Sequence, residues 1–176
     1  AGRFYPAHPD RLRAEIQTML ASARQNGGRA PKALIAPHAG YMYSGPIAAS
    51  AYALLEHARD VVSRVVLIGP SHFVSFDGLA VSDADAFETP LGPVWLDKET
   101  IARARVLPQV CVNEHAHLPE HSLEVQLPFL QTVLSDFRVV PLLVGTASEK
   151  EVGQVIDALW GGAETCVVVS SDLSHY

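Results

Sequence analysis

Short apolar runs and longer amphipathic segments alternate along the chain. Runs rich in Val, Ile and Leu, without polar alternation, lie at residues 33–36, 65–68, 139–144 and 166–169. Such runs are typical of strands that are buried on both faces of a parallel sheet. Apolar residues at helical spacing fill the segments near 9–24, 46–58, 123–134 and 152–160. The pattern predicts an α/β fold, in which a mainly parallel central sheet lies between two layers of helices.

Local signals refine several of these elements. Residues 79–96 contain short apolar stretches separated by turn residues, which indicates an antiparallel excursion from the parallel order. Asp97 is placed to cap a short helix, and Ser148 with Glu151 forms a capping box. Pro128 interrupts the apolar stripe of 123–134, so we expect either a kink or a later helix start there.

Composition narrows the class of protein. The chain has 176 residues, of which 48% are hydrophobic and 18% charged, which is the balance of one compact domain. Its formal net charge is −6, and Lys and Arg are not clustered, so the sequence shows no positively charged patch that would bind nucleic acid or an anionic membrane. A small ligand is therefore expected. The two cysteines form no CxxC pair, which fits a reducing cytoplasm.

Side chains that could bind a metal or take part in catalysis follow three of the four apolar runs. His38 lies in APHAGYMYSG, His72 in GPSH, and Asp172 and His175 in SSDLSHY. Because the carboxyl ends of parallel strands meet at one edge of a sheet, we expect the His38 and His72 rings to converge there. Two imidazoles with a carboxylate or a further histidine favour a divalent-metal site with open positions, and the two-histidine, one-carboxylate set suits Fe(II).

Other side chains in these motifs admit more than one interpretation. His121 precedes Glu124 by three residues, a spacing that places both on one helix face. The serines of PSH and SSDLSHY could serve a hydrolase, although the chain lacks a GxSxG elbow; Ser170 and Ser171 are better explained as partners of the loop backbone. Three further histidines are assigned to the surface, namely His8, His57 and His115.

The motifs AGRFYP, APHAGYMYSG, LIGPSH, TPLG, EHSLEVQLPFL, PLLVG and VVVSSDLSHY occur in this order. In this set the chain resembles the Memo family, whose prokaryotic members are called AmmeMemoRadiSam system protein B. That family is similar in fold to class III extradiol dioxygenases, which open catechol rings with non-haem Fe(II). The resemblance implies that His38 and His72 are metal ligands and that His121 occupies the place of the acid/base. Glu124 would then orient His121, as its helical spacing allows.

The third ligand is where the sequence departs from the family pattern. Animal Memo proteins carry a cysteine where Ser174 stands, and a neutral hydroxyl is a poor ligand beside a thiolate or carboxylate. Either Asp172 or His175 takes this position, or water fills it, or the metal is bound weakly. Fe(II) is the first expectation for the metal, with copper or zinc as alternatives.

These observations predict a metal-dependent oxidoreductase related to the extradiol dioxygenases. The alternatives are a ligand- or peptide-binding signalling protein without turnover, and a metal-dependent or serine hydrolase. The resemblance also implies partnership with an AMMECR-type protein and a radical SAM protein. We expect residues 1–176 to form one domain, and, since family members continue beyond the last motif, we expect Tyr176 not to be the natural C-terminus.

Overall fold

A six-stranded sheet forms the centre of the fold in the computed structural model, which describes residues 1–23 and 29–173. Its strand order is β1-β8-β2-β7-β3-β6. In that order the strands are β1 (Ala33–Ala36), β8 (Thr165–Ser170), β2 (Arg64–Pro70), β7 (Arg138–Val144), β3 (Leu79–Val81) and β6 (Val110–Val112). The first four are mutually parallel. They contain the four apolar runs of the sequence, so the predicted parallel sheet is confirmed.

The antiparallel excursion predicted for residues 79–96 is present, but it is divided between two sheets. Strand β3 runs antiparallel to β7 and extends the central sheet, with β6 parallel beside it. Strands β4 (Ala86–Thr89) and β5 (Gly92–Trp95) form a separate antiparallel hairpin. Strand β6, which is three residues long, was not predicted from the sequence.

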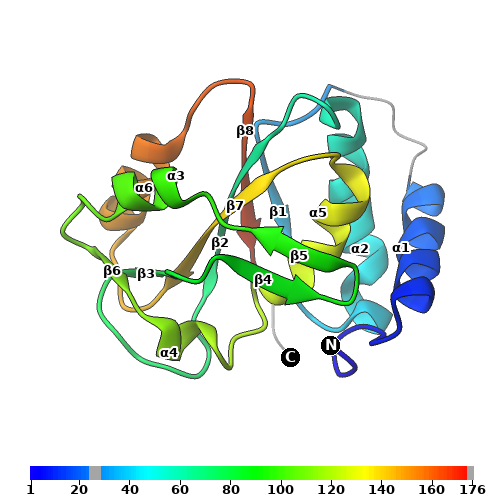
Figure 1. The fold of residues 1–176 in the computed structure, drawn as a ribbon, viewed down its shortest axis with the longest axis horizontal. Coiled ribbons are helices and arrows are strands. Elements are labelled where there is room, and N and C mark those ends of the chain that lie inside the picture. Colours follow the sequence, from blue (N-terminus) through cyan, green and yellow to red (C-terminus); the bar gives the residue numbers. More distant parts are fainter. Residues whose placement is uncertain (24–28, 174–176) are drawn as a thin grey trace.

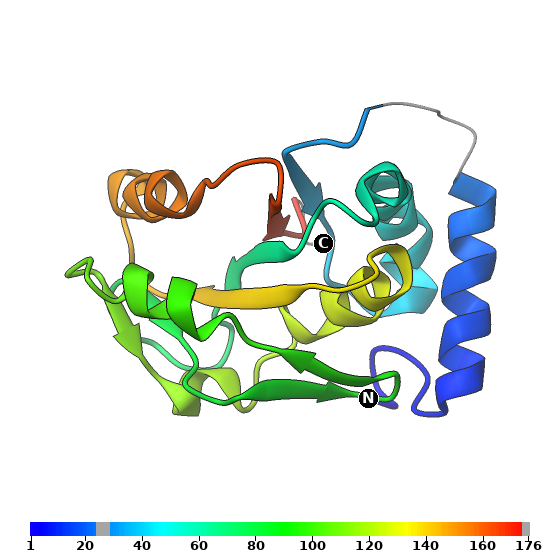
Figure 2. The ribbon, with the colours of Figure 1, turned by 45° about the horizontal axis from the view of Figure 1, so that its top comes forward.

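Helices cover both faces of the sheet (Figure 1). On one side lie α1 (Pro9–Ala23), α2 (Tyr41–Tyr52) and α5 (Leu127–Val133), and on the other lie α3 (Lys98–Ala104) and α6 (Glu149–Leu159). The tilted view keeps the two groups apart (Figure 2). The remaining helical turns are η1 (Ala53–Ala58), α4 (Glu114–His117) and η2 (Glu124–Gln126). The structure is thus the expected three-layer αβα arrangement.

Two helices contain a proline near their beginning. Helix α2 begins at Tyr41 and not near Pro46. Gly40 caps this helix, and the Gly40 backbone oxygen accepts from Ser44 N at 3.1 Å. Pro46 therefore lies inside α2, where it removes one helical hydrogen bond. Pro128 lies in the first turn of α5, where a missing N–H costs little, so the later helix start is correct and no kink is needed.

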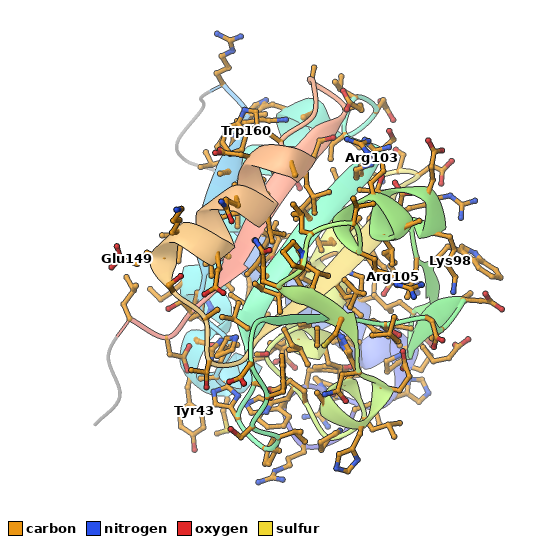
Figure 3. All side chains as sticks on the ribbon, turned by 90° about the vertical axis from the view of Figure 1, so that its left-hand side faces the viewer. Tyr43, Lys98, Arg103, Arg105, Glu149 and Trp160 are labelled. Carbon is orange, nitrogen blue, oxygen red and sulfur yellow. The ribbon has the colours of Figure 1, made fainter. Side chains whose placement is uncertain are left out.

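The core fills the space between the sheet and both helical layers. Strands β2 and β7 run through its middle, and five consecutive residues of each are buried. Helix α6 covers the face of the sheet that is turned toward the viewer in Figure 3, with Glu149 and Trp160 at its two ends. Its side chains Val155 and Leu159 are buried. Among the described residues, no helix combines the length and the apolar character that crossing a bilayer requires.

Asp97 joins the α3 layer to the central sheet. It caps α3 by accepting from Thr100 N at 2.9 Å, and it accepts from Arg64 Nε, at the start of β2, at 2.7 Å. Burial alone raises the pKa of the Asp97 carboxyl, but the hydrogen bonds from Arg64 and Thr100 outweigh burial and hold that pKa below its ordinary value. The ionised form is therefore the one that stabilises the fold.

We expect Asp97→Ala to lower the free energy of unfolding at neutral pH by about 1–3 kcal/mol, because it removes a helix cap and leaves Arg64 without this carboxylate. Urea denaturation measures the change. Since the folded pKa is depressed, the contribution is present above the unfolded-state pKa of about 3.9 and disappears as pH falls through the folded value. Asp85→Ala removes a surface pair with Lys98 and should cost less than about 1 kcal/mol. Equal effects of the two substitutions would contradict this account of Asp97.

Candidate metal centre

Three histidine rings meet at the carboxyl ends of the central strands. His38 follows β1 and His72 follows β2, and their ring centroids lie 5.1 Å apart. His121, which precedes η2, lies 4.9 Å from His72 and 6.0 Å from His38 between centroids. The convergence of His38 and His72 that the strand ends predict is therefore present.

A buried hydrogen-bond network behind His38 determines which ring nitrogen carries its proton. His38 Nδ1 lies 3.1 Å from the hydroxyl of Ser170, the last residue of β8. The same hydroxyl lies 2.6 Å from the backbone oxygen of Ser122, which can only accept, so the hydroxyl donates there. Its two lone pairs remain for incoming donors.

Gln126 supplies one of those donors. Its Nε2 lies 3.0 Å from the Pro37 carbonyl and 2.8 Å from Ser170 Oγ, while its Oε1 accepts from the Tyr52 hydroxyl at 2.8 Å. Because a carbonyl must face the amide nitrogen, the orientation of this buried side chain is determined. The second lone pair of Ser170 then accepts from His38 Nδ1–H, which leaves the lone pair of the ring on Nε2.

Glu120 determines the proton position of His72 in the same way. Its Oε1 lies 2.9 Å from His72 Nδ1, and a carboxylate can only accept, so Nδ1 carries a proton and, in the neutral ring, Nε2 has the lone pair. The backbone N–H groups of His121 and Ser122 also donate to Oε1, at 2.8 and 2.9 Å, and that of His72 donates to Oε2 at 2.6 Å. Four hydrogen bonds therefore converge on one carboxylate, whose side chain is 2% exposed.

These bonds keep Glu120 ionised. Burial alone raises the pKa of its carboxyl, but the hydrogen bonds from His72, Ser122 and His121 reverse that effect and lower the pKa to about 2. Sequence analysis missed Glu120, although the acidic side chain directly before His121 in LPEHS was a usable signal. His72, Glu120 and His121 also offer one potential ligand atom each within 4.8 Å of one another, a second way in which this group could hold a metal.

His121 is held by stacking on both faces. Its ring lies 4.2 Å from the Phe4 ring at an interplanar angle of 6°, and 4.9 Å from the His72 ring at 18°. Its Nδ1 is buried, 3.5 Å from Glu120 Oε1. Burial lowers the pKa of His121 despite the opposing charge of Glu120, so the neutral ring predominates at neutral pH.

Glu124 lies beside this group, and its hydrogen bond connects it to the N-terminal segment. Its Oε1 accepts from the Tyr5 hydroxyl at 2.5 Å. Burial and this contact raise the pKa of Tyr5 far above its ordinary value. Glu120 is the carboxylate found beside the ring of His121, and the orienting role expected for Glu124 stays a prediction.

Asp172 follows β8, between the two strand ends that carry His38 and His72. Its Oδ1 accepts from the His38 backbone N–H at 2.7 Å, and its Oδ2 lies 3.8 Å from His38 Nε2. Burial lowers the pKa of His38, while the charge of Asp172 opposes that shift. Asp172 is thus placed beside the histidine pair. His175, the alternative third ligand, and Ser174 lie outside the described residues.

Two serines of the hydrolase interpretation are occupied by backbone partners. Ser71 Oγ donates to the Val74 carbonyl at 2.7 Å, and Ser170 Oγ donates to the Ser122 carbonyl. Each hydroxyl therefore donates its proton to a backbone carbonyl and not to a histidine; the ring near Ser170, His38, donates to that hydroxyl. The three histidines assigned to the surface are exposed, as expected; they are His8, His57 and His115.

The profile of the Memo-like protein family matches residues 1–176. The chain belongs to the Memo family. Among its relatives, a MEMO1 family protein of Aquifex aeolicus is 37% identical over 180 residues, and one of Methanosarcina barkeri is 39% identical over 182 residues. Both alignments cover 100% of this chain and 66% of the relative. A MEMO1 family protein of Thermotoga neapolitana is 35% identical over 199 residues, covering 100% of this chain and 69% of the relative. This Memo chain therefore spans about two thirds of the length of these relatives.

The proton positions of the Memo histidines are directly measurable. In long-range proton–nitrogen correlation NMR spectra of the metal-free protein, the neutral forms of the His38 and His72 rings should be protonated on Nδ1. Ser170→Ala should release that preference at His38 alone and cost about 1–3 kcal/mol of stability, since Nδ1–H loses its buried acceptor. Glu120→Gln should change His72 alone. Protonation of His38 on Nε2 in the unaltered protein would contradict the network.

Proposed function

We propose that this Memo chain is a divalent-metal-dependent oxidoreductase related to the class III extradiol dioxygenases, with His38 and His72 as metal ligands. The observation that carries the proposal is the shared proton position of the two rings. Each Nδ1–H is committed to an acceptor behind the ring, Ser170 Oγ for one and Glu120 Oε1 for the other. Each Nε2 therefore has the lone pair that a metal ion requires, and a hydrogen-bonded Nδ1 is the usual support of a metal-binding histidine.

The donor set fits a divalent ion. A centroid separation of 5.1 Å between His38 and His72 is compatible with two ring nitrogens at about 2.0–2.1 Å from one ion. Asp172 Oδ2 and His38 Nε2, both acceptors, lie 3.8 Å apart. One ion can bridge these two atoms if it lies about 2.0–2.1 Å from each. Asp172 would complete the two-histidine, one-carboxylate set that suits Fe(II), with copper or zinc as alternatives.

Glu120 serves as a positioning residue in this proposal. Three of its four incoming hydrogen bonds converge on Oε1, and the one from His72 Nδ1 orients a candidate metal ligand. A bound metal would supply Lewis acidity and one-electron redox capacity at the strand ends. The proton transfer belongs to His121, because a neutral imidazole held between Phe4 and His72 can accept a proton from a substrate hydroxyl and return it.

Metal analysis of anaerobically purified protein tests the ligand assignment. His38→Ala with His72→Ala should abolish stoichiometric metal, and Glu120→Gln should weaken metal affinity about 10- to 100-fold, because His72 loses its orienting carboxylate. His57→Ala is the matched control, since His57 is exposed and lies outside this group. Metal retained in the double variant would overturn the proposal.

His121→Phe separates the acid/base role from ligation. The variant keeps an aromatic ring to stack on Phe4, so it should retain metal while oxygen consumption with a panel of catechols falls about 100- to 10,000-fold. Loss of metal in this variant would instead support ligation by His72, Glu120 and His121. Ligand binding that is unchanged by chelators, without oxygen consumption, would favour the non-catalytic binding protein.

A further inference from the structure

A cavity of about 450 Å³ lies beside the histidines, between β4, α4 and the start of the helical segment formed by η2 and α5. Its volume lies within the range typical of small-molecule sites. Apolar side chains from three separate segments line it, namely Phe87, Leu118, Leu123 and Leu127. The cavity can therefore take the apolar or aromatic body of a small molecule.

The polar side chains that line the cavity are all acceptors. Glu88, Glu114 and Glu124 contribute carboxylates. His117 Nε2 lies 3.1 Å from the Ala80 carbonyl and must donate there, so its Nδ1 carries a lone pair. Among the described lining residues there is no Lys, Arg, Ser, Thr, Tyr, Asn or Gln. The cavity therefore offers a ligand many acceptors and no side-chain donor.

We propose that this cavity binds an amphipathic organic amine. The ammonium donates to the glutamates of the rim, and the aromatic or aliphatic body packs on Phe87 and the leucines. An ammonium has three donors and no acceptor, which complements the lining, whereas an anion would meet several carboxylates and no Lys or Arg side chain among the described lining residues. The cation that the structure places at this lining, the Ala1 ammonium, already pairs with Glu124 Oε1 at 2.8 Å.

The cavity is connected to the histidines through one residue. Glu120 borders the cavity and also accepts from His72 Nδ1 at 2.9 Å. A ligand in the cavity therefore lies next to the carboxylate that orients a candidate metal ligand. If the proposed function is correct, the substrate would be such an amine, with an aromatic ring and an ammonium group; this step rests on the proposed function. The binding itself does not, because the cavity lining includes neither His38 nor His72.

The test uses metal-free protein and three probes of similar shape: phenethylamine, phenethyl alcohol and hydrocinnamate. Backbone amide NMR titrations should show phenethylamine binding about tenfold more tightly than the other two probes, with shift changes concentrated at residues 84–88 and 114–118. Hydrocinnamate binding as tightly as the amine would overturn the proposal, as would amine-induced shifts concentrated elsewhere. Because metal is absent, failure here is distinguishable from failure of the proposed oxidoreductase.

Variants locate the interaction. Glu88→Gln removes one carboxylate charge and should weaken phenethylamine binding about 2- to 5-fold, as expected for a partly solvated ion pair, while leaving phenethyl alcohol unchanged. Glu149→Gln is the matched control, because Glu149 lies at one end of α6 (Figure 3) and is not among the residues that line the cavity. Ala86→Trp should fill the cavity and abolish binding of the amine. Wild-type affinity in both Glu88→Gln and Ala86→Trp would overturn the proposal, and the Glu88→Gln result stands alone if the tryptophan variant does not fold.

Discussion

The buried amide of Gln126 is the contact on which the geometry of the site depends. It connects four separate parts of the chain by donating to the Pro37 carbonyl after β1 and to Ser170 at the end of β8, and by accepting from Tyr52 on α2. The side chains of Gln126, Tyr52 and Ser170 are buried, where an unmade hydrogen bond is costly, so the network tolerates one arrangement. The tautomer of His38 follows from that arrangement, since Ser170 has a single lone pair left to offer.

The sheet supplies the second constraint. Strands β1, β8 and β2 are neighbours and run parallel, so the residues that follow them, His38, Asp172 and His72, emerge at one edge. This placement could be predicted from the sequence, because buried parallel strands produce long apolar runs and their carboxyl ends carry the polar motifs. The short strands β3 and β6 could not be placed in the same way. β3 pairs with β7 and β6 pairs with β3, so their positions depend on tertiary contacts and not on a local pattern.

The carboxylate of Glu120 shows why part of the site could not be predicted. Its role depends on four hydrogen bonds, and the two from His72 come from a residue 48 positions away. Spacing along the chain favoured Glu124 as the partner of His121, because helical periodicity is visible in a sequence. In the fold, His121 lies before the helical turn of η2, and the carboxylate beside its ring is that of its own neighbour in sequence. The loop conformation before η2 therefore determines which carboxylate lies beside His121, and helical periodicity could not predict it.

The two parts of the candidate site share one electrostatic character. Behind the histidines, Ser170 and Glu120 accept hydrogen bonds from Nδ1–H, so that in each neutral ring the lone pair is on Nε2. In the neighbouring cavity, glutamates and His117 Nδ1 again present acceptors. Such a surface attracts cations and donors and repels anions, and Glu120, with a pKa of about 2, keeps its charge throughout the physiological pH range. The metal cation proposed at the histidines and the ammonium proposed in the cavity would therefore both answer to this arrangement of lone pairs, with Glu120 common to both.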